Sequence, residues 1–176
     1  QFRQDVDFQL FNVSQAVAQG EGERALELMA PLVAVNTANE DLKMVELMLL
    51  LSQGKIKQLE QRLEALDLPE RNQALVRARL ALRNGNLEAA ETFFLKAVDA
   101  KDFYGYLDYA RFLVEQGRTE EASSRYQDIL RQEPENVVAL QGQSIIYELN
   151  GDPEAAAQEL KKILSRNPED AYTMTR

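Results

Sequence analysis

The sequence predicts an all-α fold, a solenoid of about five helix–turn–helix hairpins that stack in chain order. Two observations predict it. Glycines recur at intervals of 34, 31, 32 and 34 residues, at Gly20, Gly54, Gly85, Gly117 and Gly151. The segments between these glycines carry apolar residues at the 3.6-residue period of amphipathic helices. A repeat period of this length is typical of solenoids, in which each hairpin buries its apolar face against its neighbours.

The first hairpin is predicted over residues 6–39. Residues 6–19 carry a helical stripe of apolar side chains, and Gly20 to Gly22 interrupt it, because glycine readily adopts turn conformations. A second amphipathic helix follows over residues 23–35. We expect Pro31 to kink this helix or to shorten its regular part.

The second hairpin is predicted over residues 40–70. Residues 40–53 are apolar on nearly all sides, so we expect this helix at the centre of the stack, with Asn39 or Thr37 as its N-cap. Residues 56–66 form the partner helix. Leu59 stands five residues after the turn glycine, where the other hairpins have alanine, and we therefore expect these two helices to stand further apart.

The third hairpin, residues 71–102, joins helices over 70–84 and 87–100 at Gly85, and its short spacing marks it as a degenerate repeat. The fourth and fifth hairpins, residues 103–136 and 137–170, repeat each other at 34 residues. Their matching pairs are Gly117 with Gly151, Ala122 with Ala156, and Pro134 with Pro168. Residues 171–176 are expected to begin a further helix, so we interpret the chain as part of a longer protein.

The last two hairpins resemble tetratricopeptide (TPR) repeats. In that family two large residues and a small one mark the first helix, a small residue marks the second, and a proline ends the unit. The residues that carry the resemblance are Tyr106, Tyr109, Ala110, Ala122, Tyr126 and Pro134, then Leu140, Ser144, Tyr147, Ala156, Leu160 and Pro168. Gln143 departs from the pattern, because the family prefers a large apolar residue there. The resemblance implies a right-handed α-solenoid whose first helices line a concave groove for a peptide or a partner helix.

The composition excludes several classes of function. The chain has no Cys and no His, which removes thiolate chemistry and the commonest acid–base and metal-ligating side chain. It also has no phosphate loop or dinucleotide fingerprint, so we predict that it is not an enzyme and takes no metal or cofactor. A net charge of −9 makes nucleic acid a poor partner. No apolar run approaches the ~20 residues that span a bilayer, so we expect no direct membrane insertion.

The resemblance places ten residues on the groove. They are Met44, Met48, Leu75, Arg79, Arg83, Tyr104, Leu107, Arg111, Gln141 and Ile145. Arg79 and Arg83 share a helix face, and Arg111 stands in the register of Arg79 one repeat later, so we expect the three to converge on an acidic group of a partner. The alternative is that they pair with nearby acids such as Asp108. Met44 and Met48 suit an adaptable binding surface, and core packing is an equally good interpretation.

Two hypotheses of function follow. The first is a non-catalytic scaffold whose groove binds a peptide or helix of a partner protein. An acidic peptide or helix is the candidate ligand. The second is a structural TPR segment of a bacterial envelope assembly, in polysaccharide export, secretion or pilus biogenesis, that uses its convex face or its ends. This second hypothesis includes self-association of the chain through the open ends of the solenoid. The compartment stays open between bacterial cytoplasm and periplasm.

Overall fold

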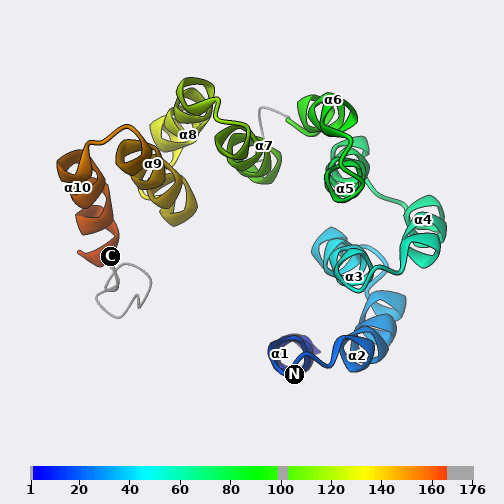
Figure 1. Ribbon diagram of the computed structural model, residues 1–176. Helices are drawn as coiled ribbons and strands as arrows, with labels where there is room; N and C mark the ends of the chain where they lie inside the picture. The colour runs from blue at the N-terminus through cyan, green and yellow to red at the C-terminus, as the bar shows by residue number, and fades with distance from the viewer. Residues whose placement is uncertain (1, 99–102, 166–176) are drawn as a thin grey trace. The chain divides into compact units, whose positions relative to one another are not determined.

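The computed structural model describes residues 2–98 and 103–165, and within these ranges the backbone forms ten α-helices and no strand (Figure 1). The all-α prediction is confirmed. The chain divides into two compact units, Gln1–Gly85 and Asn86–Arg176, and each is described by itself.

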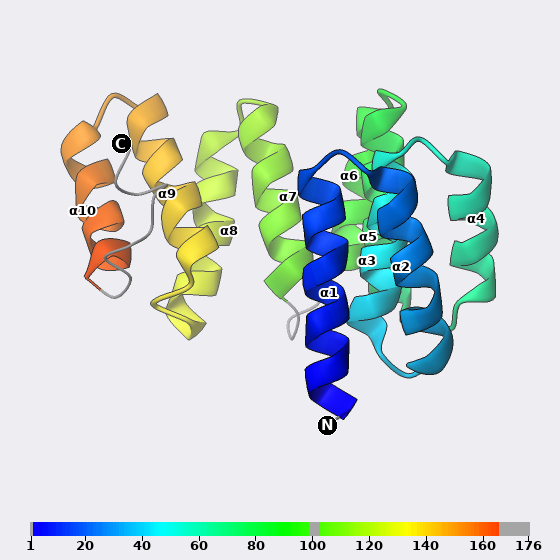
Figure 2. The same cartoon turned by 90° about the horizontal axis from the view of Figure 1, so that it is seen from below.

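The first unit contains five of these helices: α1 (Phe2–Ala18), α2 (Gly22–Val35), α3 (Glu40–Ser52), α4 (Ile56–Ala65) and α5 (Glu70–Arg83). Helix α1 packs on α2, α2 packs on α3, and α3 also contacts α4 and α5 (Figures 1 and 2). Within this unit the 40–53 helix thus contacts three of the other four helices, and its predicted place at the centre of the whole stack stays a prediction. Helices α3 and α4 contact each other less extensively than α1 and α2 do, which agrees with the bulkier Leu59 between them.

Two details of the first unit go beyond the sequence-based expectations. Helix α2 runs on past Pro31 to Val35, the end predicted for it, so of the two effects expected of the proline, shortening does not occur and a kink stays a prediction. Helix α3 is less uniformly apolar inside than its sequence suggests, because Lys43 and Glu46 are buried. Lys43 Nζ donates to the carbonyl oxygen of Asp67 at 2.6 Å, and Glu46 accepts two hydrogen bonds from Arg62. Paired in this way, the two charges are tolerated inside the hairpin.

The second unit contains α6 (Leu87–Ala97), α7 (Phe103–Glu115), α8 (Thr119–Gln132), α9 (Val137–Leu149) and α10 (Pro153–Leu164). Consecutive helices pack on each other, and α7 also contacts α9. Helix α6 ends at Ala97, earlier than the predicted residue 100, because Val98 leaves the helical conformation. The further helix predicted to begin at residues 171–176 lies outside the described residues.

The turns confirm the repeat that the glycines predict. All five turn glycines have positive φ angles, between 70° and 76°, a conformation that a side chain disfavours. Polar N-caps precede four of the helices. The side chain of Asn39 accepts a hydrogen bond from the Leu42 amide, and each of the other three caps likewise accepts one from the backbone amide three residues after it. These caps are Asn86, Asn136 and Asp152. Of the two caps considered for α3, Asn39 is therefore the one used.

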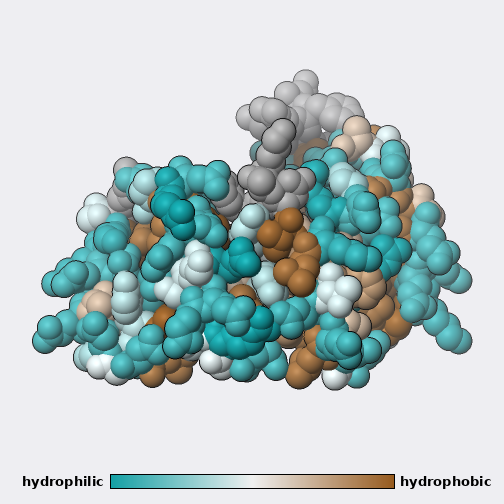
Figure 3. All heavy atoms as spheres, turned by 90° about the horizontal axis from the view of Figure 1, so that it is seen from above, coloured by the Kyte–Doolittle hydropathy of each residue, from teal (hydrophilic) through white to brown (hydrophobic). Residues whose placement is uncertain are grey.

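The surface is mostly hydrophilic on the face shown in Figure 3, where apolar side chains form separate patches. Large apolar side chains on the described surface include Phe8 and Phe11 of α1, which are 63% and 57% exposed. None of the described helices is long and apolar enough to cross a membrane.

Candidate functional site

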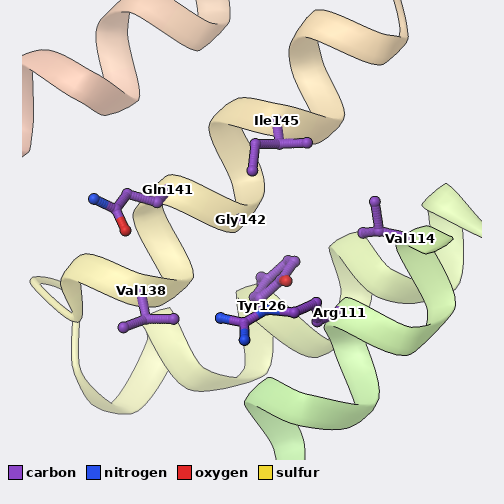
Figure 4. Close-up of a pocket in the computed structure, with 7 residues that line it drawn as sticks. All are labelled: Arg111, Val114, Tyr126, Val138, Gln141, Gly142 and Ile145. Atoms are coloured by element: carbon purple, nitrogen blue, oxygen red, sulfur yellow. The ribbon is translucent and has the colours of Figure 1, made fainter. Parts of the chain in front are cut away.

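A pocket of 320 Å³ opens between α7 and α9, the first helices of the last two hairpins (Figure 4). Helix α7 contributes Arg111 and Val114, and α8 contributes Tyr126 from below. The residues from α9 are Val138, Gln141, Gly142 and Ile145. The volume lies at the lower end of the range for ligand pockets, about 300–1,000 Å³, which suits a few side chains of a ligand.

A glycine in the middle of α9 makes room for the Tyr126 ring in the lining of the pocket. A Cβ atom at Gly142 would lie 2.2 Å from Cζ of Tyr126, so any side chain at this position would collide with the ring. Because Gly142 has none, the Tyr126 ring fits beneath α9 and is only 4% exposed. An interior helix glycine weakens a helix by about 1 kcal/mol relative to alanine, which the close approach of the ring offsets here.

The polar groups of the pocket are a cation and a buried phenol. Arg111 is exposed and forms no ion pair with any residue in the described ranges. Burial raises the pKa of Tyr126, and the charges of Asp108 and Glu115 add to this, while the nearby charge of Arg111 lowers it. The phenol is therefore protonated at neutral pH and can donate a hydrogen bond.

Three of the ten predicted groove residues, Arg111, Gln141 and Ile145, line this pocket. Sequence reasoning counted Tyr126 only among the residues that carry the TPR resemblance and did not predict its contact with the next repeat. A signal for it was present, because a glycine inside an otherwise helical pattern marks a close approach of another group. The binding role of the three residues stays a prediction.

The predicted residues of the first unit make contacts within that unit. Arg79 Nη1 lies 3.0 Å from the sulfur of Met48, and Arg83 Nη1 donates to the carbonyl oxygen of Leu51 at 2.8 Å. Met44 and Met48 are partly buried and pack against the α3–α4 core. The core-packing interpretation of the two methionines therefore holds for much of their surface. Leu75 is 8% exposed, which leaves little of it for a partner.

The remaining two predicted residues lie on α7. Leu107 is half-buried and is not part of the pocket lining. The side chain of Tyr104 lies outside the described residues. Arg79 and Arg83 belong to the first unit and Arg111 to the second, so their predicted convergence stays a prediction.

A polar cluster away from the pocket links three helices of the second unit. Tyr109 of α7 donates to Oε1 of Glu91 on α6 at 2.9 Å, and Arg118 donates to the same oxygen at 2.6 Å. Arg118 also forms a two-bond pair with Glu121 of α8, at 2.7 and 2.8 Å. Within the described ranges no group of three acidic side chains is placed to hold a metal ion.

Comparison with known proteins identifies the repeat. Two family models described as tetratricopeptide repeat match residues 75–104 and 107–171. No curated protein sequence matches the chain.

Several solved structures resemble this chain along nearly its whole length. TTC0263, a thermophilic TPR protein in Thermus thermophilus, has a TM-score of 0.73 at 18% identity, over 97% of this chain and 96% of that one. YrrB, a TPR protein with an unusual peptide-binding site, has a TM-score of 0.60 at 15% identity, over 93% and 87%. MamA 41-end from Desulfovibrio magneticus RS-1 has a TM-score of 0.57 at 13% identity, over 94% and 97%. At these identities the likeness shows the fold, an all-α helical-repeat solenoid.

Proposed function

Because the chain belongs to the tetratricopeptide repeat family, we propose that it is a non-catalytic scaffold that binds a segment of a partner protein in the α7–α9 pocket. TPR repeat proteins are generally interaction scaffolds, and their fold stacks helical hairpins into extended surfaces. The function proposed here is therefore recognition, with no turnover of the bound segment.

The observation that carries the proposal is the lining of the pocket. It combines aliphatic side chains, from Val114, Val138 and Ile145, with the exposed cation of Arg111 and the amide of Gln141. Protein-binding surfaces are typically built in this way, with an apolar centre and a few polar groups that fix orientation. YrrB, which shares the fold, is itself described as having a peptide-binding site, and this supports the choice of a peptide segment.

The proposal can be tested by affinity capture from the native source with the full chain as bait. The variant Ile145→Glu places a charge in the apolar part of the pocket and should abolish capture of the partner. The matched control is Leu95→Glu on α6, which makes the same chemical change at a leucine that is 55% exposed and outside the pocket. Mass spectrometry of the captured proteins is the readout, and circular dichroism confirms that both variants are folded.

The proposal predicts a protein that the native chain and Leu95→Glu capture and Ile145→Glu does not. A set of captured proteins that is the same for all three baits contradicts it. Single substitutions at Arg111 and Ile145 are sharper probes than changes at Arg79 and Arg83, because the latter two contact Met48 and Leu51 of their own chain.

A second candidate function is a structural segment of a larger assembly, with contacts through helix α1. The observation that favours it is the exposure of Phe8 and Phe11, 63% and 57%, three residues apart on one face of that helix. Neighbouring exposed aromatic side chains are typical of protein contacts. This function predicts that Phe8→Ser with Phe11→Ser loses the captured proteins and that Ile145→Glu keeps them.

A further inference from the structure

The polar side chains that line the α7–α9 pocket are chiefly hydrogen-bond donors. Arg111 has only donors, the protonated hydroxyl of Tyr126 donates, and Gln141 supplies an amide with two N–H groups. No carboxylate is among the lining residues, although Asp108 and Glu115 act on the Tyr126 hydroxyl from outside the lining. The chemistry of the pocket therefore suits a ligand group that accepts several hydrogen bonds and carries negative charge.

The guanidinium of Arg111 lacks the partner that comparable arginines of this chain have. Arg24, Arg62 and Arg118 hold carboxylate oxygens at 2.8, 2.7 and 2.6 Å. Arg111 holds none within the described ranges, although the chain has 29 acidic and 20 basic residues. A guanidinium fork matches a carboxylate with two parallel hydrogen bonds, so a ligand carboxylate would supply what the chain itself does not.

The hydroxyl of Tyr126 is a second donor without a partner in the described chain. Its residue is 4% exposed, its hydroxyl forms no hydrogen bond with a described residue, and it lines the pocket. In Figure 4 the ring of Tyr126 and the guanidinium of Arg111 lie in the same part of the pocket, below α9. The charge of Arg111 also acts on this hydroxyl, so both donors face the same ligand group.

The apolar residues of α9 set the length of the ligand. Val138 and Ile145 are seven positions apart, which corresponds to about 10 Å of helix at 1.5 Å per residue. An extended chain advances about 3.3 Å per residue, so this distance holds about three residues. Gln141 lies between the two aliphatic side chains. The lining thus offers a polar position with an apolar contact on each side.

We propose that the pocket selects an internal segment of a partner protein in which an Asp or Glu side chain is flanked by aliphatic residues. This inference rests on the proposed function, because it names the ligand of the same pocket. Recognition depends on local contacts, since the net charge of −9 repels an acidic ligand at long range. Selectivity for the acid accordingly resides in the fork of Arg111 and the hydroxyl of Tyr126.

The test is a selection from a library of random seven-residue peptides on the immobilised full chain. Selected peptides are then synthesised with an amidated C-terminus, and their affinities are measured by fluorescence anisotropy. The variant Arg111→Gln removes the fork, Ile145→Ala removes an apolar contact, and Arg131→Gln is the matched charge control. Arg131 lies on the same unit, pairs with Asp128 and does not line the pocket.

The proposal predicts that Asp or Glu is enriched beside Val, Ile or Leu. It also predicts that Arg111→Gln weakens peptide binding about 10- to 100-fold. Replacing the acidic residue of the peptide, Asp by Asn or Glu by Gln, should weaken binding by a similar factor. Arg131→Gln should leave the affinity within about twofold, because an exposed charge acts only weakly at a distance.

Three results overturn it, and they distinguish it from the proposed function. In the first, the selected peptides have no acidic residue, and their affinity for the chain falls with Ile145→Ala and not with Arg111→Gln. The pocket is then a peptide site of another specificity. Peptides that bind only with a free C-terminal carboxylate show that the acid is not an internal side chain. If no selected peptide depends on Ile145 or Arg111, both the inference and the proposed function are wrong.

Discussion

The hydroxyl of Ser144 has no hydrogen-bond partner, although its residue is fully buried in α9. Among the described residues it is the single fully enclosed side-chain polar atom in this situation, whereas the Tyr126 hydroxyl opens to the pocket. A buried polar group without a partner is destabilising by about 1–3 kcal/mol, because it has lost water and gained nothing in return. The position requires a small side chain for packing. Serine is small enough, but its hydroxyl makes no hydrogen bond there.

Ser144→Ala should therefore stabilise the protein by about 1–2 kcal/mol, as a higher midpoint in urea unfolding followed by circular dichroism. The matched control is Ser124→Ala on the exposed side of α8, which reports the helix propensity of alanine alone and should gain about 0.5 kcal/mol. A loss of stability for Ser144→Ala would show that the hydroxyl has a partner.

Single residues also show where sequence reasoning stops. Gln143 departs from the repeat pattern, and the structure buries it at 3% exposure with hydrogen bonds to and from Ser123 Oγ, at 3.0 and 3.2 Å. The two residues are 20 positions apart, a distance unrelated to the repeat period, so no sequence pattern pairs them. Tyr126 and Gly142 form a similar pair, and only the glycine signals it.

At the scale of helices, local signals placed most ends correctly. Positive-φ glycines and Asn or Asp caps act within a few residues, so they can be recognised in the sequence alone. The burial of Glu46 could not be predicted, because it depends on Arg62 of the next helix, 16 residues on. Contacts between helices are set by packing, and one sequence without its structure does not contain them.

The Glu46–Arg62 pair joins α3 to α4. Removing Arg62 alone should destabilise the protein more than removing both residues. Arg62→Met leaves the nearly buried Glu46 carboxylate without its partner and should lower the free energy of unfolding by about 2 kcal/mol. Adding Glu46→Met should recover most of this loss, since the buried charge is then gone. Urea unfolding of the two variants and the native chain measures both steps. A double variant as unstable as Arg62→Met alone would contradict this account.

The Arg118 cluster joins α6, α7 and α8 and should give a pH-dependent contribution to stability. Arg118 holds the pKa of Glu121 below its ordinary value of 4.5 by hydrogen bonding. A lowered carboxyl pKa in the folded state stabilises the fold above that ordinary value and loses its effect as pH falls through the folded pKa. The melting temperature of Arg118→Gln should therefore lie below that of the native chain at pH 7, and the gap should shrink towards pH 3. A gap that is constant with pH would contradict the role of Glu121.

At the scale of the whole molecule, the repeat period predicted the order of the hairpins, and the family implied which helices carry a groove. Arg111, Gln141 and Ile145 could be placed in advance because they follow the repeat register. The floor of the pocket could not, because Tyr126 belongs to the second helix of its hairpin and reaches the next repeat only through the gap at Gly142. The predicted contribution of Arg79 and Arg83 spans the two compact units and stays open.

If a partner protein docks in the α7–α9 pocket, a photo-crosslinker placed in that pocket should capture it. A photoreactive amino acid replaces Gln141, which lines the pocket, or Gln158, an exposed glutamine of α10 outside it. Illumination in an extract of the native source should join the chain to a partner from position 141 and not from position 158. Cross-links of equal yield from both positions, or from position 158 alone, would contradict it.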